Sequence, residues 1–208
     1  GLDYPKEKLE IIIASDASTA RTEEIVLRYN HAGITFVKMP QRKGKTAAQN
    51  FAVSKARGDI LVFSDATTLY KRDALLKLSG NFSDERVGIA AGEEEFIKDP
   101  NRMYKEAGVS WEYEKVLRRL ENKFNSLIGV SGCIFAIRKN LYEKLDDNLI
   151  EDFALPLMVL EKGYKVVLEK EAIAYEDAVL RPKDEFARKA RIVSGGINAL
   201  FFQLPFSY

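Results

Sequence analysis

The sequence has few of the residues that most often bind metals or form cross-links. Its 208 residues include a single cysteine and a single histidine. With only Cys133, the chain cannot form an internal disulfide or a thiolate metal cluster, and we expect this side chain to be a small buried hydrophobic group. Such cysteine usage fits a reducing compartment.

The sequence also lacks a dominant charge sign and a long apolar run. Its 32 basic and 31 acidic residues give a formal net charge of +1, so we expect no nucleic-acid partner. No apolar run approaches the roughly 20 residues of a membrane span, and the chain as given is expected to be soluble. A hydrophobic content of 46% is enough for one well-buried domain.

Two apolar segments, however, each end in an aspartate. Residues 59–64 lead into Asp65, and residues 10–15 lead into Asp16. Both segments have the composition of buried strands, and the carboxyl ends of parallel strands meet at one edge of a sheet. The pattern therefore predicts that the two carboxylates lie at the same edge, where they would serve a metal or a polyanion.

The first hundred residues alternate expected strands and helices with short links. The strands are expected at 10–15, 34–38, 59–64 and 87–91, and the helices at 22–30, 45–57 and 72–79. This alternation predicts an α/β fold with a parallel, doubly wound sheet.

The second half of the chain shows a less regular order of expected helices and strands. A long helix is expected at 102–124, a strand at 133–137, a helix at 150–161, strands at 165–168 and 172–175, and a basic helix at about 184–200. No linker rich in Pro, Gly or Ser separates the halves, so we expect one domain, residues 1–208, with functional halves at 1–100 and 101–208.

Six short segments together resemble a known family. They are Ser-Asp-Ala-Ser-Thr at 15–19, Arg-Lys-Gly-Lys-Thr-Ala-Ala-Gln-Asn at 42–50, Phe-Ser-Asp-Ala-Thr-Thr at 63–68, Gly-Val-Ser-Gly-Cys at 129–133, Glu-Asp-Phe at 151–153 and Arg-Lys-Ala-Arg at 188–191. In this order they resemble the family 2 glycosyltransferases of the GT-A fold, especially the membrane-linked branch with hyaluronan, chitin and cellulose synthase-like enzymes.

The resemblance implies a Rossmann-like, mostly parallel sheet with helices on both faces. It implies an inverting glycosyltransferase that moves a sugar from a nucleotide-diphospho-sugar to an acceptor hydroxyl, in bacterial polysaccharide or cell-envelope glycan synthesis. Residues 1–100 would then bind the nucleotide-sugar, and residues 101–208 a glycan or lipid-linked acceptor. The expected location is the cytoplasmic side of the cell membrane, with membrane contact through segments absent from this chain.

The resemblance assigns the donor site to three residues. Asp16 would hold the nucleotide base, and Asp65 corresponds to the first acid of the DxD motif, which binds Mg²⁺ or Mn²⁺ across the two phosphates. Lys45 follows Gly44 at a helix start, where an ammonium and free amides favour a diphosphate. The motif here reads Asp-Ala-Thr, and because Thr67 replaces the second acid, we expect weak metal binding without nucleotide.

The catalytic and acceptor residues are also implied by the resemblance. Asp152 matches the carboxylate that takes the proton of the acceptor hydroxyl, a role that needs a positioned base. Glu151, Ser131 and Gly132 match the acceptor site.

Arg188 and Arg191 stand in place of the QxxRW motif and would neutralise the departing diphosphate. The glutamine and tryptophan of that motif are replaced by Arg188 and Ile192, which argues against processive extension.

Other departures leave alternatives open. The strand and Pro-x-x-Asn-Glu loop with which the family begins have no counterpart, so we expect the domain to be truncated, and its apolar end suggests the same of the other terminus. The main alternative is a non-catalytic, degenerate GT-A domain that binds a nucleotide or a partner. A nucleotidyltransferase is a weaker one, because no Gly-rich segment precedes the first expected helix.

Overall fold

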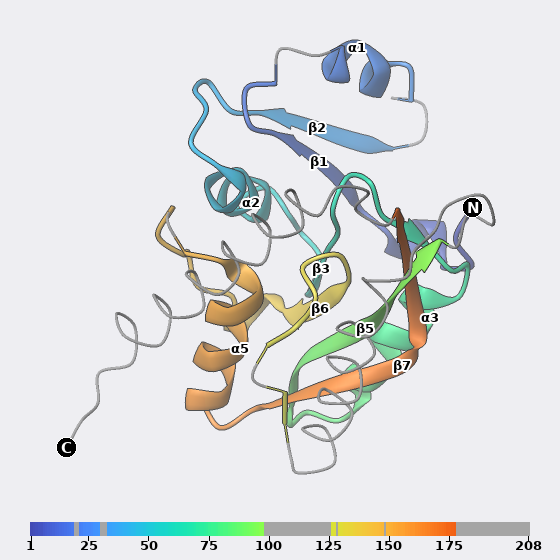
Figure 1. Ribbon diagram of the computed structural model, residues 1–208, viewed down its shortest axis with the longest axis vertical. Helices are drawn as coiled ribbons and strands as arrows, with labels where there is room; N and C mark the ends of the chain where they lie inside the picture. Colours follow the sequence, from blue (N-terminus) through green and yellow to red (C-terminus); the bar gives the residue numbers. More distant parts are fainter. Residues whose placement is uncertain (19–20, 30–32, 98–125, 128, 148, 178–208) are drawn as a thin grey trace, which may run out of the picture.

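The strands of the protein form two separate groups in the computed structural model (Figure 1). The structure describes residues 1–18, 21–29, 33–97, 126–127, 129–147 and 149–177. Over these ranges, one group is a pair of strands and the other is a sheet of five. The two groups contribute different parts of the site described below.

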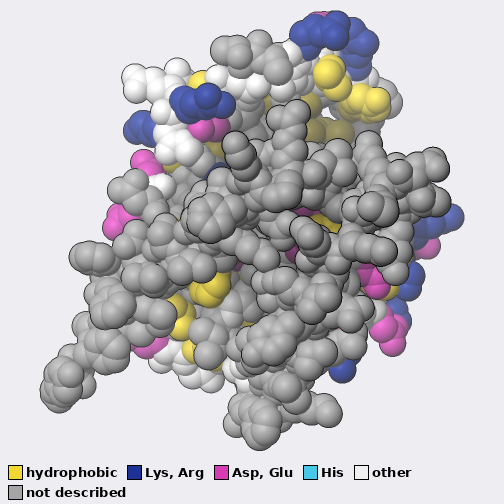
Figure 2. All heavy atoms as spheres, in the orientation of Figure 1, with side chains coloured by type: hydrophobic (Ala, Val, Ile, Leu, Met, Phe, Trp, Pro, Cys, Tyr) yellow, Lys and Arg dark blue, Asp and Glu magenta, His cyan; other side chains and the backbone are white. Residues whose placement is uncertain are grey.

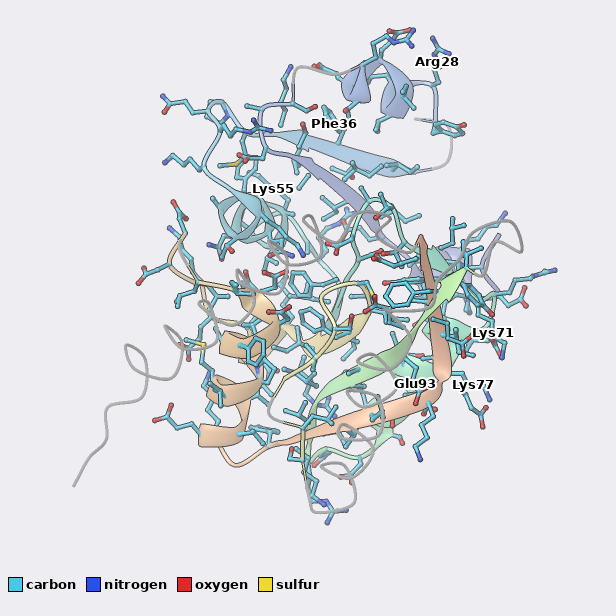
Figure 3. All side chains as sticks on the ribbon, in the orientation of Figure 1. Arg28, Phe36, Lys55, Lys71, Lys77 and Glu93 are labelled. Carbon is cyan, nitrogen blue, oxygen red and sulfur yellow. The ribbon has the colours of Figure 1, made fainter. Side chains whose placement is uncertain are left out.

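The smaller group consists of β1 (Ile11–Ser15) and β2 (Ile34–Lys38), which run parallel, with α1 (Thr22–Leu27) between them in the chain. We call these three elements the β1–β2 layer. It occupies the upper end of the molecule in Figure 1, and Figure 3 labels Arg28 beside α1 and Phe36 on β2. Ile11 is 38% exposed, although its strand is strongly apolar.

The larger group is a sheet in the order β3-β6-β5-β7-β4. Its strands are β3 (Ile60–Phe63), β4 (Leu69–Tyr70), β5 (Val87–Ile97), β6 (Phe135–Arg138) and β7 (Lys165–Asp177). Only β5 and β7 pair in parallel, while β6 runs antiparallel to both of its neighbours and β4 antiparallel to β7. The described sheet is therefore mixed, where a mostly parallel one was expected, because an apolar pattern identifies a strand without fixing its direction.

Besides α1, the described residues form three α-helices, of which the first packs on β1 and β2 and the other two on the larger sheet. They are α2 (Lys45–Val53), α3 (Ala74–Gly80) and α5 (Glu151–Glu161). Short 3-10 helices lie at Lys6–Lys8, Asn81–Ser83 and Lys139–Leu141. Over the ranges given above, every helix falls short of the length and apolarity that crossing a bilayer needs.

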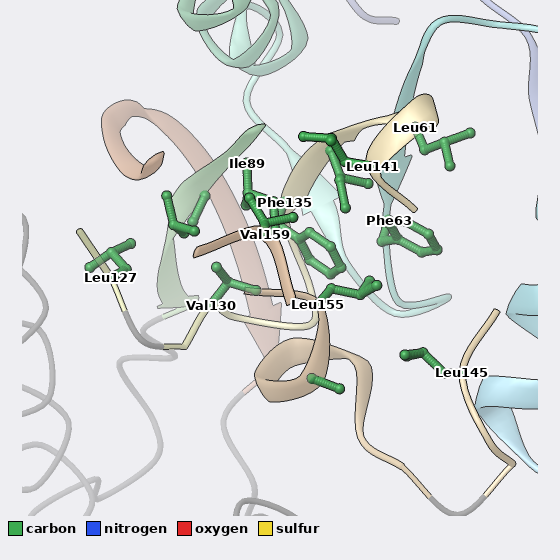
Figure 4. Packing of buried hydrophobic residues seen from close by; sticks show 14 of the residues in the cluster. Leu61, Phe63, Ile89, Leu127, Val130, Phe135, Leu141, Leu145, Leu155 and Val159 are labelled. Atoms are coloured by element: carbon green, nitrogen blue, oxygen red, sulfur yellow. The ribbon is translucent and has the colours of Figure 1, made fainter. Parts of the chain in front are cut away.

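The main core lies between the larger sheet and α5. Phe135 is fully buried on β6, and its ring stacks on Phe63 with centroids 4.9 Å apart. Figure 4 shows Ile89, Leu155 and Val159 packed around the same point, and all three are fully buried. Cys133 is 3% exposed and unpaired, which confirms that it is a small buried group.

Close packing leaves no room for a side chain at Gly88 on β5. A Cβ there would lie 2.5 Å from Val159 Cγ1 and 2.9 Å from Leu141 Cδ1. Glycine is therefore required for α5 to approach the sheet.

Most expected elements are confirmed, with changed ends. The strands expected at 165–168 and 172–175 are one strand, β7, and β5 continues beyond residue 91 through three glutamates to Ile97. The helices expected at 102–124 and 184–200 lie outside the described residues.

Candidate active site

The ammonium of Lys45 joins two carboxylates from distant parts of the chain. Lys45 begins α2, directly after Gly44, whose φ of 99° is readily adopted only by glycine. Its Nζ lies 2.7 Å from Oδ1 of Asp65, which follows β3, and 2.7 Å from Oε1 of Glu151, the first residue of α5. Three elements therefore meet at one charged group.

Electrostatics hold this lysine in its charged form. Burial alone would lower the pKa of Lys45, but the charge of Glu151 and a hydrogen bond to Asp65 outweigh burial and raise the pKa above its usual value. The side chain of Glu151 is only 5% exposed, whereas that of Lys45 is 48% exposed. The ammonium thus compensates a buried charge, while about half of the lysine side chain remains exposed.

Gly132 marks the point where the second acid of α5 joins this group. A Cβ on Gly132 would lie 3.4 Å from Lys45 Nζ, 3.5 Å from Asp152 Oδ2 and 3.6 Å from Glu151 Oε1. The absence of a side chain keeps this small space open between the three charged groups. Asp65 and Asp152, both predicted from the sequence, are therefore brought to the same place.

A proline ties the turn at 129–132 to the backbone of Asp152. Pro156 lies inside α5 and has no N–H with which to bond the carbonyl four residues earlier. That carbonyl belongs to Asp152, and it accepts a hydrogen bond from the backbone N–H of Val130 at 3.0 Å. The turn that carries Ser131 and Gly132 is fixed in this way beside the two acids.

Asp16 binds the loop before Lys45. Its carboxylate oxygens accept hydrogen bonds from the backbone N–H groups of Lys43 at 2.7 Å and Gly44 at 2.8 Å. Asp16 therefore positions the start of α2, and binding of a nucleotide base by Asp16 stays a prediction. Figure 2 shows Lys and Arg side chains over the loop between β2 and α2, which contains Arg42 and Lys43.

Gln49 is a site residue that the sequence reasoning missed. Its Nε2 donates to Glu151 Oε1 at 3.1 Å. Gln49 lies four residues after Lys45 on α2, so both side chains point from the same helical face towards the same carboxylate. This spacing is the signal that would have identified it.

A second polar group lies on the other side of the 129–132 turn. Ser131 Oγ donates to Glu94 Oε2 at 2.8 Å and lies 3.1 Å from Cys133 Sγ. Burial raises the pKa of the Cys133 thiol to about 12, with the charge of Glu94 adding to the effect. The thiol is thus protonated at neutral pH, and nothing in the sequence indicated the contact with Glu94.

The same side contains a hydrogen-bonded tyrosine and a second glutamate. Tyr70 donates through its hydroxyl to the carbonyls of Cys133 at 3.1 Å and Phe63 at 3.2 Å. Thr68 Oγ1 donates to Glu176 Oε1 at 2.6 Å, which links the segment after Asp65 to β7. These bonds fix the backbone on both sides of Asp65.

Asp65 has the properties of a ligand to a cation that is mainly bound by substrate. Its side chain is 38% exposed and offers a hard carboxylate oxygen, the donor type that Mg²⁺ and Mn²⁺ prefer. Thr67 is exposed, and within the described ranges no group of three or more His, Cys, Asp or Glu residues would hold a metal. The residues fit a divalent ion that takes its other ligands from phosphates and water.

A separate hollow lies at the other end of β3. A cavity of about 550 Å³ is lined by Asp59, Ile60, Arg138, Lys139 and Asn140. Asp59 and Ile60 are at the amino end of the strand whose carboxyl end leads to Asp65. This cavity is therefore not part of the charged cluster.

The predicted residues thus fall into three sets. Lys45, Asp65, Glu151, Asp152 and Gly132 lie together, and Ser131 and Asp16 are each one step removed through neighbouring residues. Glu151 is directed at Lys45 and Gln49, and its acceptor contact, like that of Ser131, stays a prediction. Arg188 and Arg191 lie outside the described residues.

Comparison with known proteins identifies the family of this chain. The model of the family named "Glycosyl transferase family 2" matches residues 2–146, more than half of the chain. The chain belongs to glycosyltransferase family 2. The match includes Asp16, Lys45, Asp65 and the 129–132 turn.

Relatives with curated names lie within the same family. The chain is 28% identical to the probable glycosyltransferase YdaM of Bacillus subtilis, covering 98% of this chain and 53% of YdaM. It is 24% identical to the poly-beta-1,6-N-acetyl-D-glucosamine synthase of Staphylococcus aureus, covering 81% of this chain and 43% of the synthase. The chain therefore spans about half the length of these family 2 relatives.

A solved structure shows the fold. The mannosyltransferase PcManGT of Pyrobaculum calidifontis, in complex with GDP-Man and Mn²⁺, superimposes with a TM-score of 0.82 at 23% identity. The match covers 96% of this chain and 57% of PcManGT. The GT-A fold expected from the family 2 resemblance is confirmed.

Proposed function

We propose that this chain is the catalytic domain of an inverting glycosyltransferase that acts on a nucleotide-diphospho-sugar. The observation that carries the proposal is that Lys45, which is paired with Asp65, and Asp152 meet at Gly132. A diphosphate needs cationic groups, and an attacking hydroxyl needs a base. The cluster offers both within a few ångströms, in a chain of family 2.

The donor side of the reaction would rest on Lys45 and Asp65. Asp65 would hold Mg²⁺ or Mn²⁺, which when bound supplies positive charge to the two phosphates. Lys45 would contact the same phosphates through its exposed ammonium. Arg188 and Arg191 are proposed to neutralise the departing diphosphate. Asp16 is proposed to bind the nucleotide base, in addition to holding the loop before Lys45.

The acceptor side would rest on Asp152. A sugar hydroxyl has a pKa far above neutrality, so its proton must leave as the oxygen attacks the anomeric carbon. Asp152 would take that proton, while Ser131 and Gly132 would border the hydroxyl. One base opposite one leaving group gives a single displacement and an inverted anomeric centre, by analogy with the inverting glycosidases.

The test is glycosyl transfer from a panel of UDP- and GDP-sugars. Release of nucleoside diphosphate identifies the donor, and NMR of the product gives the anomeric configuration. Asp152→Asn preserves size but cannot accept the proton, so turnover should fall by roughly two to four orders of magnitude. Donor affinity should hardly change, because Asp152 does not contact the phosphates in this proposal.

Asp147→Asn is the matched control, since Asp147 is an exposed aspartate that precedes α5 and should not affect transfer. If Asp152→Asn retains near-normal transfer with a normal fold, Asp152 is not the base. A product of retained configuration would exclude the single displacement.

The second candidate is a degenerate GT-A domain that binds a nucleotide or a partner without catalysis. Thr67, where the family has a second acid, favours it. Tight binding of a nucleoside diphosphate with no sugar released from any donor would support this alternative.

The proposed setting is synthesis of a polysaccharide or cell-envelope glycan in a bacterium. The acceptor would be a growing glycan or a lipid-linked sugar at the cytoplasmic side of the membrane. The poly-N-acetylglucosamine synthase among the relatives supports this class of product. Assays should therefore include membrane fractions as a source of acceptor.

A further inference from the structure

Lys45 neutralises Asp65, the carboxylate assigned to the metal in the proposed function. Its Nζ lies 2.7 Å from Asp65 Oδ1, which is hydrogen-bonding distance for a charged pair. A divalent cation bound to the same oxygen would stand about as close, at roughly 2.0–2.2 Å. Two cations this close to one carboxylate repel one another, so the ammonium on Oδ1 weakens the binding of a metal to Asp65.

The ion pair with Glu151 also holds the Lys45 ammonium in this position. Glu151 is 5% exposed, and an ionised carboxylate at that depth requires a positive partner. Lys45 supplies it at 2.7 Å, and Gln49 adds a neutral hydrogen bond at 3.1 Å to the same oxygen. Glu151 therefore holds Lys45 in a place from which it also reaches Asp65.

The lysine is nevertheless able to move. Its side chain is 48% exposed, in contrast to the glutamate that holds it. Gly132 places no side chain beside Nζ, where a Cβ would lie 3.4 Å from the ammonium, so this neighbour does not clamp the lysine. A diphosphate, which carries more negative charge than Asp65, would compete for the ammonium of this half-exposed side chain.

We propose that Lys45 is an internal counter-ion that shields Asp65 from divalent cations until a diphosphate draws the ammonium away. Glu151 is the positioning residue that keeps Lys45 in the shielding position. This inference rests on the proposed function, since it assigns the diphosphate and the metal to the same donor. It makes metal and nucleotide binding depend on each other through one side chain.

The first experiment measures Mn²⁺ binding without nucleotide by calorimetry. Lys45→Met removes the charge and keeps much of the side-chain volume, so Mn²⁺ affinity should rise at least about tenfold. Lys43→Met is the matched control: the same charge is removed two residues away, from an exposed side chain, and Mn²⁺ affinity should stay within about twofold. Equal Mn²⁺ affinity in the wild type and Lys45→Met overturns the shielding role.

A second pair of variants guards against misfolding, because Lys45→Met leaves Glu151 buried without its cation. Glu151→Gln removes that charge, and Lys45→Met/Glu151→Gln then removes the ammonium without stranding a carboxylate. The double variant should bind Mn²⁺ at least about tenfold more tightly than Glu151→Gln. Adding Asp65→Asn to the double variant should abolish the gain, and a gain that survives would place the metal elsewhere and refute the proposal.

Nucleotide binding separates this proposal from the proposed function. Wild-type protein with Mn²⁺ is titrated with GDP and with UDP. If neither binds, the proposed donor chemistry fails, whatever the metal titrations give. The other informative result is that one nucleotide binds together with Mn²⁺ while neither Lys45→Met nor Lys45→Met/Glu151→Gln gains metal affinity. In that case the donor chemistry stands and only the shielding role fails.

Discussion

The five-stranded sheet and the β1–β2 layer differ in how completely they are covered. In the sheet, Ile89 and Phe135 are fully buried, and a glycine is needed for α5 to pack on β5. In the layer, Ile11 is 38% exposed and Ile25 on α1 is 50% exposed. Two regions of similar apolar composition therefore contribute unequally to stability.

The difference separates fixed groups from adjustable ones. Asp65, the 129–132 turn and the acids of α5 are attached to the covered sheet, whereas Asp16 comes from the layer. Helix α2 joins the two: Asn50 Nδ2 donates to the carbonyl of Leu145 at 2.8 Å, while Asp16 binds the loop in front of the helix. Asp65 and the acids of α5 thus belong to the more completely covered part, and Asp16, which is predicted to hold the nucleotide base, belongs to the less covered part.

The largest expected contrast comes from removing one phenylalanine from each region. Phe135→Ala should lower the free energy of unfolding by about 3–5 kcal/mol, because it empties a fully buried site stacked on Phe63. Phe36→Ala on β2, which is only partly buried, should cost about 1–2 kcal/mol. Urea unfolding followed by circular dichroism measures both, and equal losses would show that the layer is as tightly packed as the sheet.

Substitution of two glycines separates two reasons for requiring glycine: crowding by side chains in the sheet, and a positive φ in the layer. Gly88→Ala should cost about 1–3 kcal/mol, since its Cβ would overlap Val159 and Leu141. Gly33, next to β2, has nothing within 4 Å but a φ of 72°, so Gly33→Ala should cost about 1 kcal/mol from backbone strain.

Asparagine distinguishes the two causes, because it tolerates a positive φ. Thermal unfolding should show Gly33→Asn to be milder than Gly33→Ala, whereas Gly88→Asn should be worse than Gly88→Ala. A Gly88→Asn variant that is more stable than Gly88→Ala would contradict the claim that Gly88 is crowded by Val159 and Leu141.

The stability of the protein at alkaline pH tests how strongly burial beside the sheet disfavours an ionised Cys133 thiolate. Burial raises the pKa of Cys133 from 9.0 to about 12, so the folded state retains a proton that the unfolded chain loses. Stability should be unaffected below about pH 9 and should fall as the pH rises towards 12, by about 2 kcal/mol at pH 10.5. Denaturation of wild type and Cys133→Ala at pH 8 and 10.5 isolates this contribution, and an identical decline in both would exclude it.

The smallest effect is expected on the outer face of the layer. Glu24 and Arg28 form an ion pair one turn apart at α1, with side chains 52% and 68% exposed. Glu24→Gln should change the free energy of unfolding by less than about 0.5 kcal/mol, because water screens exposed pairs. A loss above about 1 kcal/mol in thermal unfolding would mean that α1 depends on this pair more than its exposure suggests.

The sequence predicted the parts of the site that belong to single segments. An apolar run followed by an acid was enough to place Asp16 and Asp65 at strand ends, and Gly44 before Lys45 indicated the start of α2. The expected shared sheet edge was wrong, because β1 and β3 belong to different sheets. The resemblance to family 2 added Asp152 and the 129–132 turn. These features depend on local composition and on order along the chain.

Features that depend on pairing between segments were not predicted. The antiparallel course of β6 and the fusion of two expected strands into β7 follow from hydrogen bonds to β5, which local alternation does not encode. The partners of Glu94 and Glu151 come from segments 37 and 102 residues away. A charged residue in a short sequence window shows that a partner is needed, but not which one.

Pro156 has a consequence for any attempt to engineer this protein. Alanine in its place would favour the helix locally by up to about 3 kcal/mol, but Pro156 is fully buried, so the smaller side chain would also leave a cavity that opposes this gain. The new N–H, however, would compete with Val130 for the Asp152 carbonyl and loosen the turn that carries Ser131 and Gly132. Variants at this position should therefore be judged by product formation as well as by heat resistance, because the two properties depend on different contacts of one residue.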